Sequence, residues 1–407
     1  MTEITLLAAY LIFLASYIVF AVGKLPGLKI DRPGMAIIGA VMMVAFRAVS
    51  PDEALGHIDF VTIVLLFSMM LLVAHLHVSG FFDWVTELVV TRLHPHHLLP
   101  TVIFLSGALS AFFVNDIICL IMVPFALTAS RRMGVRPLPY LLAVATASNI
   151  GSVASITGNP QNILIGTASG ISYRTFFAHL GPIALAGLFL DWLVLWFFFF
   201  RGHWKEDAAA APVAPPVIDH AGLVKPSVVA LLILVGFFAG LPPALVAAVG
   251  AALLLITRTR EPRLVYDEVD WGLLVFFAGL FVIVRGAENA GLTDHLQALA
   301  ENVDLQQTWL LTVVTAVLSN IVSNVPAVML LKSLVPRLHD PHTAWLVTAM
   351  ASTLAGNLTI TGSVANIIVV ERARPHVHIG FWDYFRVGLP ITVLTMFVGW
   401  LWLTFVR

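Results

Sequence analysis

Charged residues are scarce in this chain: Asp, Glu, Lys and Arg together make up only 11% of its 407 residues. A soluble domain usually carries about 25% charged residues, so most of this surface is expected to face hydrocarbon. Apolar runs long enough to cross a hydrocarbon core of about 30 Å recur along the whole chain. They are continuous rather than alternating, unlike the strands of a membrane β-barrel. The sequence therefore predicts a polytopic, all-α membrane protein.

Further absences narrow the possible functions. The single cysteine, Cys119, excludes an internal disulfide framework and a thiolate cluster within one chain. The net charge of -1 provides no basic surface for nucleic acid. The N-terminus, Met1-Thr2-Glu3, has no basic region, and no small-residue cleavage site follows, so we expect a retained span rather than a signal peptide. The expected partner is a lipid bilayer, and no metal or organic cofactor is expected.

The chain is predicted to consist of two halves joined by a linker. Residues 1–201 form the N-terminal repeat, 202–224 an Ala- and Pro-rich linker, and 225–407 the C-terminal repeat. Each half is expected to hold five membrane-crossing helices, one of them broken, and one re-entrant hairpin, and this odd number of crossings inverts the second half. The hairpins are expected near 98–130 and 308–335, the broken helices near 138–169 and 342–370, and the other spans near 5–23, 34–49, 60–78, 175–200, 225–241, 243–257, 270–287 and 381–406.

An internal repeat supports this division. The phrase ITGNPQNILI begins at Ile156, and the phrase ITGSVANIIV begins at Ile360. Over the longer windows Ala147–Ile165 and Ala351–Val369, which are 204 residues apart, 7 of 19 positions are identical. The identities include Ser, Thr, Gly and Asn, which a generally apolar composition does not supply by chance. We therefore expect two copies of one structural unit.

A second set of matches has an offset of 211 residues. Asp59 precedes the third span of the first half, and Asp270 precedes its counterpart in the second half. Gly80 and Gly291 match at the same offset. The repeat therefore extends well beyond the two phrases.

The distribution of basic residues predicts the orientation in the membrane. With the N-terminus outside, 16 of the 22 Lys and Arg residues fall on the cytoplasmic side and 6 on the outside. This excess follows the positive-inside rule. We expect a multi-pass protein of the cell (inner) membrane, with both termini outside and the central linker in the cytoplasm.

Each repeated phrase is predicted to interrupt a helix in mid-membrane. The first break is expected at Gly158, with Asn159 as the N-cap of a new half-helix, and the second at Gly362, with Ser363 as the cap. A break leaves free N–H donors and the positive end of a helix dipole, and it survives in a membrane only when buried in protein or lining a cavity. Paired breaks in inverted halves therefore indicate a transport site.

The hairpins carry a second pair of polar motifs, Asn115-Asp116 and Ser323-Asn324, at an offset of 209 residues. Each Asn is expected to be the N-cap of the descending limb. Asp116 has no acidic equivalent, because Val325 occupies the matching place. An ionised carboxylate at membrane depth costs about 2.5–3.5 kcal/mol on insertion scales, so such residues usually carry protons or cations.

The predicted substrate-binding residues are polar, or lie at a backbone break, in these four motifs. They are Asn115, Thr157, Gly158, Asn159, Asn162, Ser323, Asn324, Thr361, Gly362, Ser363 and Asn366. Asp116 is predicted to carry the coupling proton, with helix capping as a compatible alternative role. The small residues Ala147, Gly151, Ala355 and Gly356 are equally consistent with close helix packing alone.

These features resemble the ion transporter superfamily, which includes arsenite/antimonite efflux permeases of the ArsB type, sodium/proton antiporters, divalent-anion/sodium symporters and citrate permeases. The resemblance covers nearly the whole chain. Sodium/dicarboxylate symporters of this superfamily typically carry Ser-Asn-Thr at both hairpin tips, whereas here the tips read VND from Val114 and SNV from Ser323. The Asn-Asp tip is similar to that of arsenite permeases and of some antiporters.

The resemblance implies a secondary active transporter that exports arsenite or antimonite in exchange for protons by alternating access. It also implies that a proton replaces one sodium ion at the Asn-Asp tip. Relatives of this kind can associate with a soluble ATPase subunit and are often homodimers. The alternatives are a sodium- or proton-coupled carboxylate or anion symporter and a sodium/proton antiporter. Arsenite is an uncharged trihydroxide at neutral pH, which amide and hydroxyl side chains can bind.

An enzyme and a passive channel are alternatives from other functional classes. An intramembrane aspartyl protease needs two facing acids, and Asp116 has no clear acidic partner in the sequence. The Gly-x-Ser-Gly phrase of a rhomboid-type protease is absent. We therefore expect no enzymatic activity, and concentrative uptake would exclude a channel.

Overall fold

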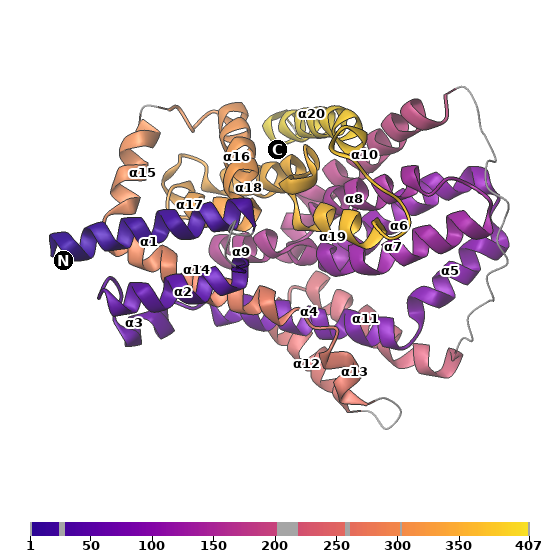
Figure 1. Ribbon diagram of the computed structural model, residues 1–407, viewed down its shortest axis with the longest axis horizontal. Coiled ribbons are helices and arrows are strands. Elements are labelled where there is room, and N and C mark those ends of the chain that lie inside the picture. Colours follow the sequence, from indigo (N-terminus) through magenta and orange to yellow (C-terminus); the bar gives the residue numbers. More distant parts are fainter. Residues whose placement is uncertain (1, 24–28, 202–218, 257–260, 302, 406–407) are drawn as a thin grey trace.

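The computed structural model describes residues 2–23, 29–201, 219–256, 261–301 and 303–405. Within these ranges the regular elements are helices (Figure 1). The larger part of the predicted linker, 202–218, lies outside the described residues. Its last residues do not form a linker, because helix α11 already begins at His220.

The helices of the first half are α1 (Glu3–Val22), α2 (Arg32–Ala45), α3 (Pro51–Gly56), α4 (Phe60–Val78), α5 (Phe81–Arg92), η1 (Pro95–His97), α6 (Leu98–Phe112), α7 (Asn115–Arg132), α8 (Leu138–Ser152), η2 (Ile156–Gly158), α9 (Pro160–Ser169) and α10 (Tyr173–Phe199). Those of the second half are α11 (His220–Phe238), α12 (Pro243–Leu255), α13 (Pro262–Tyr266), α14 (Trp271–Asn289), α15 (Leu292–Glu301), α16 (Thr308–Val322), α17 (Asn324–Leu331), η3 (Val335–Arg337), α18 (Pro341–Leu354), η4 (Ala355–Asn357), η5 (Ile360–Gly362), α19 (Val364–Ala373) and α20 (Phe381–Phe405).

The α-helices of the second half repeat those of the first in order, so that α1 to α10 correspond to α11 to α20. The helices long and apolar enough to cross a membrane form matched pairs, α1 with α11, α4 with α14, and α10 with α20. Asp59 and Asp270 cap α4 and α14 by accepting hydrogen bonds from backbone N–H groups. Gly80 and Gly291, which follow these two helices, both have positive φ angles, 83° and 93°.

The two halves are inverted in space. In Figure 1 the N-terminus, α3 and α15 lie at one end of the molecule, and α5 lies toward the opposite end. Because α3 precedes α4 whereas α15 follows α14, the two matched helices run in opposite directions. The predicted fold class is thus confirmed: an all-α polytopic membrane protein of two inverted repeats, each with a re-entrant hairpin and a broken helix.

Several short helices were not expected from the sequence. These are α3 and α5 in the first half and their counterparts α13 and α15 in the second. They are too short, or too rich in charged residues, to produce the long apolar runs by which membrane spans are recognised. They begin or end at the ends of α4 and α14 and therefore connect spans rather than crossing the membrane.

The breaks are wider than predicted. The regular helix α8 ends at Ser152 and α18 ends at Leu354, whereas the sequence placed the breaks at Gly158 and Gly362. Short 3₁₀ turns fill the intervals before the half-helices α9 and α19 begin. Asn159 is the N-cap of α9, and its side chain accepts a hydrogen bond from the backbone N–H of Asn162 at 2.8 Å, as expected.

The predicted N-caps of the hairpins are wrong. The N-cap positions are Val114 for α7 and Ser323 for α17, and neither makes a side-chain capping hydrogen bond. Asn115 and Asn324 are instead the first residues of their helices, so their side chains are available for other contacts. In the second hairpin the descending helix α17 is also short and ends at Leu331.

The first hairpin packs very closely on the first broken helix. A Cβ atom added to Gly151 of α8 would lie 2.0 Å from the backbone oxygen of Gly107 in α6. Two helix backbones approach this closely only when the residue between them has no side chain. The interpretation of Gly151 as a packing residue therefore fits the structure.

We predict that Gly151→Ala destabilises the protein, because the added methyl group meets backbone atoms that cannot rotate away. Overpacking of this kind typically costs about 1–3 kcal/mol. The measurement is the midpoint of thermal unfolding in detergent. Gly56→Ala is the matched control, since nothing lies within 4 Å of its added Cβ. Equal midpoints for the two variants would contradict the proposed close approach.

Candidate functional site

The hairpin tips and half-helix starts of both repeats meet around one cavity of about 180 Å³. The first repeat contributes Asn115 and Asp116 from the start of α7 and Pro160 and Gln161 from the start of α9. The second repeat contributes Ser323 to Pro326 at the tip before and within α17, and Ser363 and Val364 at the start of α19. The remaining wall consists of Phe20, Arg32, Pro33, Asp270, Gly272, Leu273 and Phe276 from α1, α2 and α14. The half-helix starts that follow the two breaks therefore line one and the same cavity.

Packing between the repeats explains this convergence. The half-helix α9 packs on α17 and α18 of the second repeat, and α19 packs on α7 and α8 of the first. Each half-helix start is therefore placed against the hairpin tip of the opposite repeat. The inverted symmetry relates these two arrangements. The two hairpin tips and the two half-helix starts therefore all lie at the interface between the halves.

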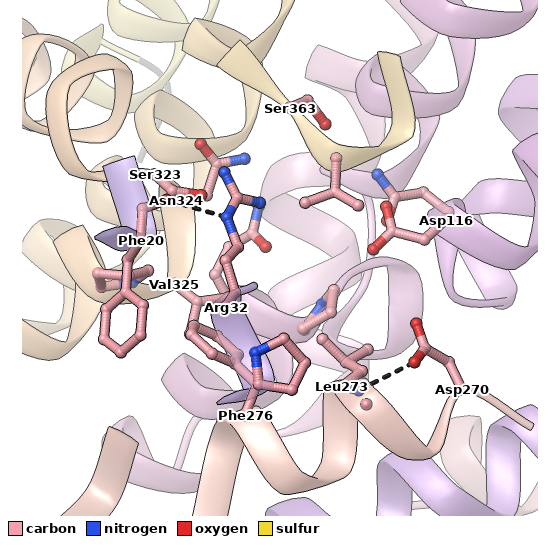
Figure 2. Close-up of a pocket in the computed structure, with 17 residues that line it drawn as sticks. Phe20, Arg32, Asp116, Asp270, Leu273, Phe276, Ser323, Asn324, Val325 and Ser363 are labelled. Atoms are coloured by element: carbon pink, nitrogen blue, oxygen red, sulfur yellow. Dashed lines mark hydrogen bonds between the residues drawn. The ribbon is translucent and has the colours of Figure 1, made fainter. Parts of the chain in front are cut away.

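Arg32, Asp116 and Asp270 line this cavity, as Figure 2 shows. The charge on Asp270 repels a negative charge on Asp116, and the charge on Arg32 attracts it. The carboxylate of Asp116 makes no hydrogen bond or ion pair among the described residues, so it remains available to a solute. With Asp116 ionised these side chains sum to one negative charge, and with Asp116 protonated they sum to zero.

Arg32 is positioned by the end of α1. Its Nε atom donates a hydrogen bond of 2.9 Å to the backbone oxygen of Phe20 (Figure 2). This oxygen belongs to the last turn of α1, where carbonyl groups have no partner within the helix. The guanidinium group thus satisfies a helix end and still presents its charge to the cavity.

Two side-chain oxygens of the hairpin tips have no hydrogen-bond partner among the described residues. These are Asn115 Oδ1 and Asn324 Oδ1, which occupy matching places in the two repeats and are both buried. A buried polar atom without a partner costs about 1–3 kcal/mol. Together with Asp116, they give the cavity acceptor groups that a hydrogen-bond donor or a cation could satisfy.

Asn149, in α8, links the tip of the first hairpin to the second break. Its Oδ1 accepts hydrogen bonds from Asn115 Nδ2 at 3.1 Å and from Ser363 Oγ at 3.0 Å. Its Nδ2 donates to Asn357 Oδ1 at 2.8 Å and to Asn366 Oδ1 at 2.9 Å. All four hydrogen-bonding positions of this amide are used, so Asn149 fixes the first hairpin relative to the second broken helix.

Thr353 occupies the matching place in the second repeat, 204 residues later. Its Oγ1 accepts hydrogen bonds from Asn159 Nδ2 and from Gln161 Nε2, each at 3.1 Å. The link between one repeat's helix and the other repeat's break is therefore made twice. Ser363 differs from its counterpart Asn159, because its hydroxyl donates to Asn149 and does not cap the half-helix α19.

The two asparagines shared by the repeated phrases satisfy the backbone of the breaks. Asn162 Nδ2 donates to the backbone oxygens of Ser152 at 3.0 Å and Ser155 at 2.9 Å. Asn366 Nδ2 donates to the backbone oxygens of Gly356 at 2.7 Å and Thr359 at 3.0 Å. The carbonyl groups are matched at the offset of 204 residues, so the same amide performs the same function in both repeats.

The two shared glycines allow the chain to fold back on itself. A Cβ atom at Gly158 would lie 2.2 Å from the backbone oxygen of Ser152, and one at Gly362 would lie 2.8 Å from that of Gly356. Any side chain at these positions would push the break away from the helix end. The presence of glycine at this place in both phrases therefore follows from backbone contact.

The predicted site residues fall into two groups. Those that line the cavity are Asn115, Asp116, Ser323, Asn324 and Ser363. Those that do not line it are Thr157, Gly158, Asn159, Asn162, Thr361, Gly362 and Asn366. The residues of the second group lie within the breaks and contact other parts of the chain rather than the cavity. Thr361 differs, because it is exposed and lies close to Thr359.

Sequence reasoning missed Arg32, Gln161 and Asp270 as cavity residues, and it missed Asn149 as the link between the first hairpin tip and the second break. Asp270 could have been found from its match with Asp59 in the repeat, whereas the counterpart of Arg32 at the same offset is Pro243, so the repeat does not mark Arg32. Asn149 lies inside the compared windows but is not identical between them, because Thr353 is its counterpart. A contact between the two repeats cannot be recognised from the sequence of either repeat alone.

Comparisons with known proteins agree with this architecture. Residues 17–355 match the family described as citrate transporter (CitMHS). The chain is 26% identical over 492 residues to the putative transporter arsB of Dictyostelium discoideum, covering 91% of this chain and 87% of that protein. It is 29% identical over 450 residues to the silicon efflux transporter LSI3 of Oryza sativa subsp. japonica, covering 92% and 93%. It is also 29% identical over 427 residues to an uncharacterized transporter of Mycobacterium tuberculosis, covering 98% of each.

A solved structure has a similar fold. The YdaH transporter of Alcanivorax borkumensis, described as having an unusual topology, superposes with a TM-score of 0.56. The superposition covers 98% of this chain and 97% of that one at 15% sequence identity. The likeness concerns the arrangement of helices, and the chemistry of the cavity comes from this chain's own residues.

We predict that Asn162→Ala and Asn366→Ala each reduce the stability of the protein, because each removes two hydrogen bonds from the side chain to backbone carbonyl groups of a break. The expected loss is about 1–3 kcal/mol per variant, measured as a lower midpoint of thermal unfolding in detergent. Asn324→Ala is the control: it removes a cavity amide whose Oδ1 has no partner among the described residues, so stability should change little. A loss for Asn324→Ala as large as for Asn366→Ala would contradict the division into two groups.

Proposed function

Because the chain belongs to the citrate transporter family (CitMHS), a family of membrane transporters, we propose that it is a secondary active transporter that exports small uncharged hydroxides. The proposed substrates are arsenite and antimonite, which leave the cell in exchange for protons. The observation that carries this proposal is the acceptor set of the cavity, namely the unpartnered Oδ1 atoms of Asn115 and Asn324 together with the carboxylate of Asp116, which lines the same space.

The chemistry of the acceptor set supports a donor-rich solute. A neutral trihydroxide has O–H donors, and each acceptor oxygen gains a partner when such a solute binds. The cavity of about 180 Å³ is smaller than the roughly 300–1,000 Å³ of pockets that enclose drug-sized ligands, which favours a small solute. Relatives whose names refer to arsB and to silicon efflux fit the same class of substrate, since silicic acid is also an uncharged hydroxide.

Competition at Asp116 provides the exchange. The ionised carboxylate accepts hydrogen bonds from the hydroxide, whereas the protonated carboxyl group has lost part of this capacity. Proton and substrate therefore compete for the same oxygens. The cavity then opens to one face of the membrane or the other with either a proton or a substrate molecule bound. Under this condition an inward proton gradient drives outward movement of the substrate.

The inverted halves supply the two accessible states. In the proposed orientation both termini lie outside and the central linker lies in the cytoplasm, as the distribution of basic residues indicates. The starts of α2 and α14 then lie on the cytoplasmic side, and the cavity receives substrate from the cytoplasm. Alternating access moves the hairpins and broken helices against the remaining spans.

A sodium-coupled carboxylate symporter is the second candidate. Arg32 projects a positive charge into the cavity and could pair with a carboxylate, and the family description refers to citrate. The free oxygens of the hairpin tips could then hold sodium. The two acids of the cavity, Asp116 and Asp270, oppose this reading because they repel a multiply charged anion.

We predict that everted vesicles containing the protein accumulate arsenite when a proton gradient is imposed, without a requirement for sodium. Asp116→Asn should lower this uptake about tenfold or more, because a charge-assisted hydrogen bond worth about 1.5–3 kcal/mol is lost. Asp52→Asn, at an exposed carboxylate of the short helix α3, is the control and should leave uptake unchanged. Uptake that needs sodium and is blocked by citrate but not by antimonite would replace this proposal with the second candidate.

A further inference from the structure

A second cavity lies beside the first break, with Ile156 of η2 and Gly166 and Thr167 of α9 in its wall. It has a volume of about 280 Å³ and is lined by the starts of α4 and α12, the end of α11 and the segment that joins α9 to α10. It shares no lining residue with the first cavity.

The wall of the second cavity repeats the wall of the first. At the offset of 211 residues, Val61 and Leu65 of α4 match Gly272 and Phe276 of α14, which line the first cavity. The same offset relates Pro243 and Ala244 of α12 to Arg32 and Pro33 of α2.

The end of α11 completes the correspondence. When the positive-φ glycines Gly23 and Gly240 that follow α1 and α11 are matched, Phe237 falls on Phe20. Both phenylalanines are fully buried, and each lines its own cavity. Three separate helices of the wall therefore obey the inverted symmetry, which chance placement of a surface crevice does not explain.

The inner side of the second cavity is closed. Tyr173, at the start of α10, lines it, and its hydroxyl lies 2.9 Å from Thr157 Oγ1 in the first break. Thr157 Oγ1 also donates to the backbone oxygen of Phe112, at the end of the first hairpin's α6, at 3.2 Å. The cavity therefore stops at Tyr173 and does not reach the hairpin tips.

Aromatic rings strengthen this closure. The ring of Tyr173 packs on Phe237 and Phe238, with centroid distances of 4.9 and 5.3 Å. Phe238 in turn packs on Phe112 of the first hairpin at 6.4 Å. The end of α11 is thus held against the end of α6, and the two must separate before a solute can pass between them. In the second repeat Thr361, the counterpart of Thr157, is exposed instead.

We propose that the second cavity is the release vestibule of the transport path and that Tyr173 closes it in the state described here. This proposal rests on the proposed function, since it assumes that a small uncharged hydroxide crosses the membrane through the chain. The wall formed by α4, α11 and α12 takes the place of the wall formed by α1, α2 and α14 when the hairpins and broken helices move. Release then requires that the contact between Thr157 and Tyr173 opens.

Single cysteines can test the position of the two cavities. The only native cysteine, Cys119, is fully buried, so the wild-type chain provides an unreactive background. Pro33→Cys and Ala244→Cys place matched thiols at the partly exposed starts of α2 and α12. We predict that a membrane-impermeant charged thiol reagent labels them from opposite faces of sealed vesicles. Labelling of both from one face, or labelling of Ala244→Cys only by a lipid-soluble reagent, would overturn the proposal.

Coupling between the two cavities is tested by reversing a proton gradient across the vesicle membrane while the labelling rates are measured. A proton gradient is used instead of arsenite because arsenite itself reacts with thiols. The two labelling rates should change in opposite directions by about threefold or more, as expected for exchange between two states. Asp52→Cys, on α3, is the control for reagent access and should not respond. A rate at Ala244→Cys that stays constant while the rate at Pro33→Cys changes would overturn the proposal. None of these readouts depends on which substrate is carried, so a wrong substrate would leave them intact.

Removal of one hydroxyl tests the closure itself. Tyr173→Phe keeps the ring but loses the contact with Thr157, so it should raise labelling at Ala244→Cys and lower it at Pro33→Cys. Tyr10→Phe is the matched control, because that hydroxyl bonds to His295 at 2.7 Å away from both cavities. Unchanged rates in Tyr173→Phe would show that Tyr173 does not hold the vestibule closed.

Discussion

The structure depends on one constraint, which is that every backbone amide and carbonyl group within the hydrocarbon must have a partner. A continuous α-helix meets this constraint by pairing its own backbone groups. The two broken helices cannot do so at their breaks, where asparagine side chains provide hydrogen-bond partners instead. Asn162 and Asn366 each donate to two backbone carbonyl groups between the helix that ends and the half-helix that begins. Because these amides are held inside the protein, the polar ends of both breaks can lie in mid-membrane beside a cavity.

The scaffold is nearly symmetric, but the charges placed on it are not. Asp116 in the first hairpin corresponds in the repeat to Val325 in the second, and Arg32 at the start of α2 corresponds to Pro243 at the start of α12. The symmetric part, which includes Asn115, Asn324 and the half-helix starts, gives a chamber shared by both repeats. The asymmetric part gives one titratable group next to the shared chamber. A transporter coupled to a proton needs both features, a path that works from two sides and a single site at which proton and substrate compete.

Much of the fold could be predicted from the sequence, because the features that determine it are local and repeated. Long apolar runs give the spans, Gly158 and Gly362 mark the breaks, and the matching of Asp59 with Asp270 indicates the second copy. The site was predicted less well. Asn162 and Asn366 were expected to contact substrate because polar side chains are costly in a membrane, yet the sequence does not tell whether an amide faces a cavity or its own backbone. Arg32 and Asn149 act through contacts between the repeats, which no window of sequence contains.

The central claim is that a proton and an uncharged hydroxide compete for Asp116, and the most direct test is proton release upon binding. Purified protein in weakly buffered detergent solution, adjusted so that the cavity carboxyl group is protonated, should release about one proton per chain when antimonite is added. Asp116→Asn should release none. A wild-type chain that binds antimonite without releasing a proton, or an Asp116→Asn chain that releases as much as wild type, would contradict the account.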